Sequence, residues 1–145
     1  MKRFLLIVLV FCGLVGLTAC TIASATYVRN FNSSSMKVHI TYSTTIDSLE
    51  MLVGTKLEFR NANKIVELNK KTWKQLDSKL DYKNTDLNSL ELIMPPSSTL
   101  EIILERYIKG IYFSNENNDT ISNFQFEETG FKGVPSVHIT YYDIK

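Results

Sequence analysis

The sequence is poor in the residues on which many small exported domains and enzymes depend. It has two cysteines, six glycines and three prolines in 145 residues. Two cysteines cannot build a disulfide framework, and the scattered glycines form no phosphate-binding loop. No apolar run reaches the length of about 20 residues that a bilayer-spanning helix needs. With 16 basic and 15 acidic residues, the chain also lacks the positive excess typical of nucleic-acid binding, so we expect no nucleic-acid partner.

The first 20 residues have a pattern of their own. Met1-Lys2-Arg3 is a short positive start, an apolar stretch runs from Phe4 to Gly16, and small residues then lead to a cysteine. These parts are the n-region, h-region and cleavage site of a secretory signal peptide. We expect residues 1–19 to be removed, which leaves 145 − 19 = 126 residues, a suitable size for one domain.

The segment Leu17-Thr18-Ala19-Cys20 resembles the lipobox of bacterial lipoproteins at every position. The resemblance implies cleavage between Ala19 and Cys20 and attachment of a diacylglyceryl group to the sulfur of Cys20. An added acyl chain on the new amino group would make this membrane attachment firm. Since Cys12 leaves with the signal peptide, the mature chain would have neither a disulfide nor a free thiol.

Two further resemblances concern the cellular setting. The abundance of Asn, Lys and Ile resembles proteins of low-GC bacteria such as the Bacteroidetes, whose surface lipoproteins tend to carry acidic residues after the cysteine. Residues 21–24 carry none, which implies an outer-membrane anchor facing the periplasm, with the cell surface as the alternative. Asp47-Ser48-Leu49 and Asp119-Thr120-Ile121 are similar to the O-glycosylation acceptor of that group, so Ser48 and Thr120 are candidate acceptors in loops or at strand edges.

Downstream of a short tether, which we assign to residues 20–26, apolar and polar residues alternate as in strands with one buried face. The domain is assigned to residues 27–145. Two hairpins are expected, 27–31 with 37–42 and 56–60 with 64–68, and further strands over 90–94, 99–105, 109–113, 121–126 and 136–143. Pro95-Pro96 should end a strand, because proline cannot donate a ladder hydrogen bond.

Trp73, Leu76 and Leu80 lie at helical spacing, which predicts one short helix near residues 72–80 with this stripe on the core. A bent strand is the alternative. With seven to nine short strands, the pattern predicts an all-β fold, an antiparallel β-sandwich of the immunoglobulin-like kind. Asn30, Ser33-Ser34-Ser35 and the segment 93–98 are similar to small immunoglobulin-like sandwiches of bacterial lipoproteins.

The pentapeptide Val-His-Ile-Thr-Tyr occurs at 38–42 and again at 137–141, and the two copies hold the only histidines, His39 and His138. On strands, the valine, isoleucine and tyrosine of each copy would face one side and the histidine the other. Two neighbouring copies could bring both imidazoles together, but zinc needs about four ligands and no cysteine is available. Two unrelated strands with solvent-facing histidines are the simpler interpretation, so we expect no metal and no cofactor.

Other catalytic patterns are weak. There is no Gly-x-Ser-x-Gly run of the kind that holds a nucleophilic serine. Glu101, Glu105, Glu127 and Glu128 are the carboxylates that could approach a partner in an acid/base pair. The alternation around Glu101 and Glu105 indicates a solvated strand face instead. Residues 115–119 are rich in oxygen ligands, but an Asn-rich turn explains them without calcium. Among the seven tyrosines, Tyr42 and Tyr141 are expected in the core and Tyr142 at the surface.

The sequence therefore predicts a lipid-anchored envelope protein that is not an enzyme and that binds another envelope protein or a glycan. One alternative is a small envelope enzyme or metal-binding protein that uses His39 and His138. Another is a structural subunit that assembles through exposed strand edges.

Overall fold

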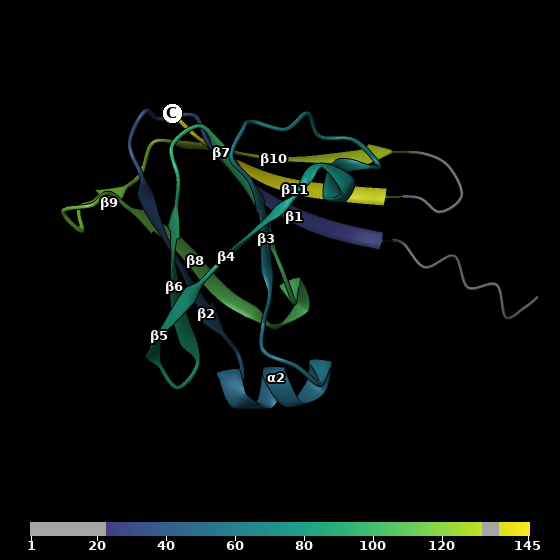
Figure 1. Cartoon of the computed structure of the whole chain (residues 1–145), viewed down its shortest axis with the longest axis vertical. Helices are drawn as coiled ribbons and strands as arrows, with labels where there is room; N and C mark the ends of the chain where they lie inside the picture. Colours follow the sequence, from purple (N-terminus) through teal and green to yellow (C-terminus); the bar gives the residue numbers. More distant parts are fainter. Residues whose placement is uncertain (1–22, 132–136) are drawn as a thin grey trace, which may run out of the picture.

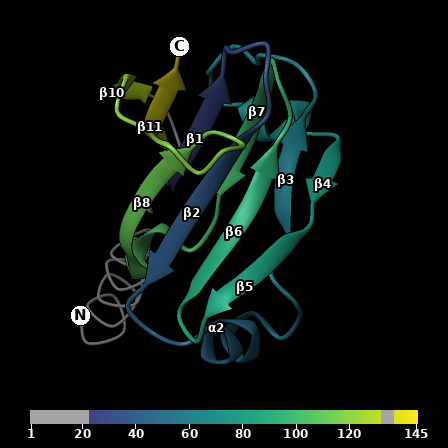
Figure 2. The same ribbon diagram turned by 90° about the vertical axis from the view of Figure 1, so that its left-hand side faces the viewer.

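The computed structural model describes residues 23–131 and 137–145. Over these residues the chain forms two β-sheets that pack face to face, with one α-helix at the lower end (Figures 1 and 2). The larger sheet has the strand order β10-β11-β1-β7-β3-β4, and the smaller has the order β5-β6-β2-β8-β9. All strand pairs in the described residues are antiparallel except β1 with β11. The expected all-β sandwich is confirmed.

Most of the described elements follow one another with short connections. They are β1 (Ala23–Asn30), β2 (Met36–Tyr42), α2 (Ile46–Val53), β3 (Phe59–Ala62), the 3-10 turn η1 (Thr72–Gln75), β4 (Ser78–Leu80), β5 (Tyr82–Asp86), β6 (Ser89–Met94), β7 (Ser98–Ile102), the 3-10 turn η2 (Glu105–Tyr107), β8 (Ile108–Ser114), β9 (Thr120–Ile121), β10 (Phe124–Phe131) and β11 (Val137–Ile144). These eleven described strands exceed the seven to nine expected, because several have only two to four residues.

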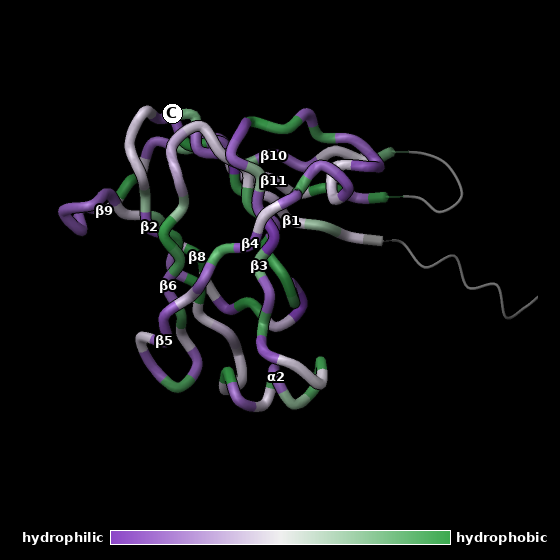
Figure 3. The backbone as a smooth tube through the Cα atoms, viewed as in Figure 1, coloured by the Kyte–Doolittle hydropathy of each residue, from purple (hydrophilic) through white to green (hydrophobic). Residues whose placement is uncertain are grey.

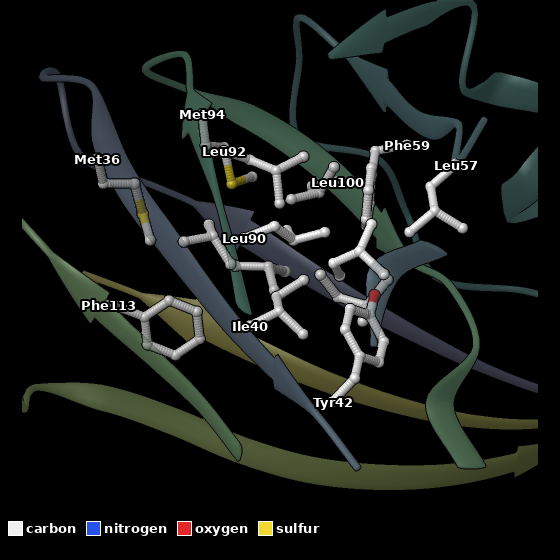
Figure 4. Packing of buried hydrophobic residues seen from close by; sticks show 14 of the residues in the cluster. Met36, Ile40, Tyr42, Leu57, Phe59, Leu90, Leu92, Met94, Leu100 and Phe113 are labelled. Carbon is white, nitrogen blue, oxygen red and sulfur yellow. The ribbon is translucent and has the colours of Figure 1, made fainter. Parts of the chain in front are cut away.

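The main core lies between the two sheets. In β2 every second residue is buried, so that Val38, Ile40 and Tyr42 face inward as the alternation predicts. They meet side chains such as Leu100 and Phe59 from the larger sheet (Figure 4). Full burial of one such side chain contributes about 1.5–3 kcal/mol, so this layer is the principal stabilising element.

A second apolar cluster covers the outer face of the larger sheet. Tyr27 and Ile139, which point away from the main core, pack there with Val66 and Leu76 from the connection between β3 and β4. Thr99 fixes this connection, because its hydroxyl donates to the Lys64 carbonyl at 3.0 Å and accepts from the Val66 amide at 2.9 Å. The prediction of a strand at 64–68 is therefore wrong, because this segment packs over the outer face of the sheet and is held there by the Thr99 side chain.

The prediction of two hairpins is wrong, because the strands expected to pair within each hairpin do not pair with each other. β1 and β2 are consecutive but belong to different sheets, so residues 31–35 cross from one sheet to the other. Asn30 stabilises the crossing, since its amide donates to the carbonyls of Ser34 and Pro95 at 3.0 Å. β3 pairs with β4 and β7 rather than with a strand at 64–68. Alternating sequence shows which residues face the core but not which sheet a strand joins.

Helix α2 was not expected. Thr45 caps its first turn by accepting a hydrogen bond from the Ser48 amide, and Gly54 ends it at a φ of 76° with its amide bonded to the Glu50 carbonyl. Both are ordinary helix-end signals. The helix expected near 72–80 is only the short turn η1, followed by β4; Leu76 is buried, but Trp73 is exposed instead of lying on the core stripe.

The start of β1 also differs from expectation. Residues 23–26, which the sequence assigned to the tether, form the first half of β1 and pair with Val137 to Thr140 of β11. The hydrophobic side chains of this strand face both clusters, because the larger sheet is covered on its two sides. Figure 3 shows how hydrophobic and hydrophilic residues alternate along the chain.

Candidate functional site

His39 lies in a cross-strand cluster on the outer face of the smaller sheet. Its ring stacks on Tyr112 of β8, with centroids 4.2 Å apart and the planes 6° from parallel. Its Nε2 is 2.9 Å from the Ser114 hydroxyl, and its Nδ1 is 3.5 Å from a carboxylate oxygen of Glu91. Burial lowers the pKa of His39, while the nearby Glu91 carboxylate opposes this shift. The sequence located His39 on the outward face but not these partners, which depend on the register of β6 and β8.

Hydroxyl, imidazole and carboxylate follow one another here in the order of a serine-type triad. The order alone is insufficient, because the nucleophile must reach a substrate carbonyl. Ser114 is buried where β8 pairs with β9, so an acyl group cannot approach its oxygen in this conformation. The cluster acts as a side-chain ladder that joins three strands of one sheet.

His138 lies in the other sheet, on β11, and its nearest acidic partner is Glu128 of β10 at 3.9 Å. The two repeated pentapeptides are therefore not neighbours, and the structure does not bring the two imidazoles together. Within the described residues no group of three or more His, Cys, Asp or Glu side chains could hold a metal ion. The second pentapeptide also differs from the first, since Ile139 and Tyr141 face the second apolar cluster rather than the main core.

The carboxylates singled out by sequence have separate positions. Glu127 and Glu128 are adjacent on β10 and face opposite sides, while Glu101 lies on β7 and Glu105 in the turn after it. Burial raises the pKa of Glu101, with Arg60 opposing the shift.

Residues 115–119 form a turn that is closed by hydrogen bonds between its two ends. The Asn115 side chain accepts from the Asp119 amide at 2.9 Å and donates to the Asp119 carboxylate at 3.0 Å. The Asn-rich turn is confirmed.

The modification candidates have different settings. Ser48 is exposed but lies in the first turn of α2, which corrects its expected place in a loop or at a strand edge, and its hydroxyl is bonded to Thr45. Thr120 is exposed at the start of the two-residue strand β9, as expected. Ala19 and Cys20 lie outside the described residues.

An exposed aromatic surface lies along the edge of the larger sheet. Phe124 and Phe126 of β10 are among the most exposed aromatic side chains, Phe126 at 50%. Each packs against Tyr142 of β11, with ring centroids 5.8 and 5.1 Å apart, and Phe124 also meets Phe113 edge-on at 5.3 Å. We call Phe124, Phe126 and the backbone of β10 the aromatic edge.

This edge corrects the expectation for the two adjacent tyrosines. Tyr142, expected at the surface, packs against the main core below the aromatic edge, and burial raises its pKa. Tyr141, expected in the core, faces the outer side, where the Arg29 guanidinium lies 5.0 Å from its ring and its hydroxyl donates to Glu127. The apolar alternation of residues 137–141 predicts Tyr141 on the core side, but β11 lies in a sheet with both faces covered, so alternation does not decide which face meets the main core.

Sequence reasoning missed the aromatic edge because the alternation in 124–131 resembles that of a half-buried strand. Burial of Phe126 would need a facing strand of similar length in the smaller sheet. The strand at that margin, β9, has two residues and pairs only with Phe113 and Ser114. The larger sheet therefore projects beyond the smaller one, and no described strand pairs with the outer side of β10.

A cleft of about 560 Å³ lies at the opposite margin, between β4, β5 and the end of α2. Tyr82 donates to Glu50 on one side of it, and Lys79 and Glu58 form an ion pair at 2.7 Å on another. Burial, followed by the bond to Glu50, raises the pKa of Tyr82 to about 12. The cleft thus combines charged groups of both signs with an aromatic ring.

None of the helices in the described residues is both long enough and apolar enough to cross a membrane. Comparison of the chain with protein-family models, with curated proteins and with solved structures finds no match.

Proposed function

We propose that this protein is a lipid-anchored β-sandwich of the cell envelope that is not an enzyme and that binds another envelope protein. The observation that carries the proposal is the aromatic edge, where Phe124 and Phe126 are exposed on a strand whose outer side pairs with no described strand. Exposed aromatic residues are enriched at protein interfaces, because they bury a large area at little conformational cost.

The outer side of β10, which pairs with no strand in the described part of the chain, supports recognition through the backbone as well. A strand at the margin of a sheet presents unpaired amide and carbonyl groups that can pair with an extended segment of a partner. β10 offers eight residues for such pairing, and its side chains are exposed along most of its length. Aromatic anchors beside a backbone template are a suitable combination for a protein partner.

Assembly from identical copies is less well supported than a heterologous partner. Symmetric antiparallel pairing over most of β10 would place Glu127 or Glu128 opposite a glutamate of the other copy, and like charges in that position destabilise a pair. Sedimentation of the purified protein tests the hypothesis of self-assembly. A stable dimer or fibre that dissolves when Thr129 is replaced by proline would favour self-assembly.

The anchor rests on the resemblance of residues 17–20 to a lipobox, which supports an acylated Cys20. The lack of acidic residues at 21–24 supports the periplasmic side of the outer membrane. Mass spectrometry of the native N-terminus is the direct test. We expect a chain that begins at Cys20 and carries acyl chains. A chain that retains Met1, or that begins with an unmodified cysteine, would contradict the anchor.

We also propose that the sandwich is immunoglobulin-like. The links from β1 to β2 and from β6 to β7, which cross between the sheets, support this assignment. An experimental structure with the strand connections of that family would support it, and different connections would contradict it.

The partner is tested by crosslinking in native envelopes with a Phe124→Ser/Phe126→Ser variant. Because both side chains are exposed, the variant should fold, and we expect its partner to be lost from the crosslinked fraction. A Trp73→Ser/Ile93→Ser variant is the matched control, since it removes two exposed large side chains elsewhere. Equal recovery of the partner by both variants would contradict the proposal.

A glycan ligand is the second candidate, favoured by the cleft beside α2. Carboxylates and an aromatic ring are the groups that hydrogen-bond and stack on sugars, and Glu50, Glu58 and Tyr82 provide them. Calorimetric titration with envelope polysaccharide should show heat that is lost in Tyr82→Ala. Equal heats for wild type and variant would contradict this candidate.

A further inference from the structure

The strand that follows the proposed anchor begins very close to it. β1 starts at Ala23, three residues after Cys20. Three fully extended residues span about 10 Å, so an acylated Cys20 would hold this end of the sandwich against the membrane surface. The inference below rests on the proposed anchor and concerns which part of the domain then faces the lipid.

Two adjoining hollows connect the start of β1 with the end of helix α2. Ser24 and Ala25 line one hollow together with Ile103 and Leu104. The same Ile103 and Leu104 line the next hollow, whose opposite side is formed by Val53 at the end of α2. The anchored strand and the C-terminal end of α2 are thus separated only by the residues that follow β7.

The end of α2 is apolar where a surface helix is normally polar. Ile46 and Leu49 turn inward and are buried in the main core. The last three residues, Met51, Leu52 and Val53, are exposed, with Met51 at 82% and Leu52 at 54%. Figure 3 shows hydrophobic residues along α2 at the lower end of the molecule.

A fourth apolar residue lies beside the same helix. Leu87, in the turn between β5 and β6, is 77% exposed, and its carbonyl accepts a hydrogen bond from the Ile46 amide at 2.8 Å. Single exposed apolar residues are common on soluble proteins and need no explanation. Four large ones around a short helix form a patch of the kind that marks a protein or membrane contact.

We propose that Met51, Leu52, Val53 and Leu87 enter the interfacial layer of the membrane that holds Cys20, so that the domain stands on α2. Since the two hollows link the start of β1 with the end of α2, the bilayer that holds an acylated Cys20 would lie within reach of this patch. Arg106, which lines the hollow beside Ser24, is exposed and can reach lipid phosphates while the apolar side chains insert.

This orientation turns Phe124 and Phe126 of the aromatic edge away from the lipid. Phe124 at the start of β10 pairs with Ile144, and Ile144 pairs with Asn30, the last residue of β1. The exposed aromatic residues therefore lie toward the end of β1 that is remote from Cys20. Membrane contact near the start of β1 and partner binding at Phe124 and Phe126 therefore use different surfaces.

The test uses the purified acylated protein reconstituted in vesicles of phosphatidylethanolamine and phosphatidylglycerol. Removal of Cys12 and acylation of Cys20 would leave Leu52→Cys as the only free thiol, which is labelled with an environment-sensitive fluorophore. Ile93→Cys is the matched control, because Ile93 is 59% exposed and lies near the far end of β6. We expect a blue shift and quenching by spin-labelled lipids at position 52 but not at position 93.

A second label tests whether the patch acts as one surface. With the fluorophore at Leu87→Cys, addition of Met51→Asp should reduce the quenching at least twofold, since a carboxylate opposes insertion. Equal quenching at positions 52 and 93, or no effect of Met51→Asp, would overturn the inference. Mass spectrometry of the same samples separates the two proposals: acyl chains on Cys20 without quenching overturn the orientation alone, whereas an unmodified Cys20 overturns the anchor.

Discussion

The ion pair between Arg29 and Asp143 gives the sharpest prediction about stability. Arg29 on β1 donates to both carboxylate oxygens of Asp143 on β11 at 2.6 Å, and the two side chains are only 15% and 8% exposed. Removal of one partner from such a pair leaves a buried charge without compensation, at a cost of about 3–5 kcal/mol. We expect the lower end of this range for Asp143→Asn, because Arg29 keeps some solvent contact and lies 5.3 Å from the Phe31 ring.

A loss of about 3 kcal/mol is a large part of the 5–15 kcal/mol that stabilises a typical domain. With an m-value of about 2 kcal/mol per molar urea, the unfolding midpoint should fall by about 1.5 M. Circular dichroism measures the strand content during the titration and is preferable to tryptophan fluorescence, since Trp73 is exposed.

The double variant Arg29→Met/Asp143→Asn separates the ion pair from simple loss of packing. It should be more stable than Asp143→Asn, because no charge is then left unpaired between β1 and β11. If Asp143→Asn shifts the midpoint by less than about 0.5 M, or the double variant is the less stable of the two, the electrostatic reasoning is refuted.

Three further predictions concern single side chains. Burial lowers the pKa of His39 below its ordinary 6.5, so the unfolded chain binds the proton more readily. Stability should therefore be complete above that value and decline as the pH falls through it. His39→Gln should reduce the drop in melting temperature between pH 7 and pH 5, and an unchanged drop would contradict this reasoning. Thr45→Ala removes the cap of α2 and should lower the free energy of unfolding by about 1 kcal/mol, measured by thermal unfolding. An unchanged melting temperature would contradict the role of the cap. Gly54→Ala places a Cβ at a φ of 76° and should cost about 1 kcal/mol in the same assay, although nothing crowds that position; an unchanged melting temperature would contradict the strain argument.

The sequence predicted much of the strand content, because period-two alternation reports directly on burial. The expected strands at 90–94, 99–105, 109–113 and 136–143 correspond to β6, β7, β8 and β11. β5 was missed, since Tyr82–Asp86 is mostly polar and lies at the margin of its sheet. Helix α2 was missed although Thr45 and Gly54 mark its ends, because eight residues are too few to establish a helical period.

The candidate surfaces were less accessible to sequence reasoning. The histidine repeat suggested a shared site, but the two copies lie in different sheets and face different environments. The aromatic edge depends on the length of β9, a strand on the other sheet, and no local pattern in 124–131 carries that information.

The sequence by itself determined the alternation that makes this an all-β protein, the absence of thiol chemistry downstream of Cys20, and the expectation of a lipid anchor. These follow from residue types and from spacings along the chain. Only the tertiary structure decided which strands share a sheet, which tyrosine of the pair 141–142 meets the core, and which apolar residues stay exposed. Those outcomes depend on contacts between segments far apart in sequence, such as Arg29 with Asp143 and β1 with β7, and a one-dimensional pattern does not encode which face a distant segment will cover.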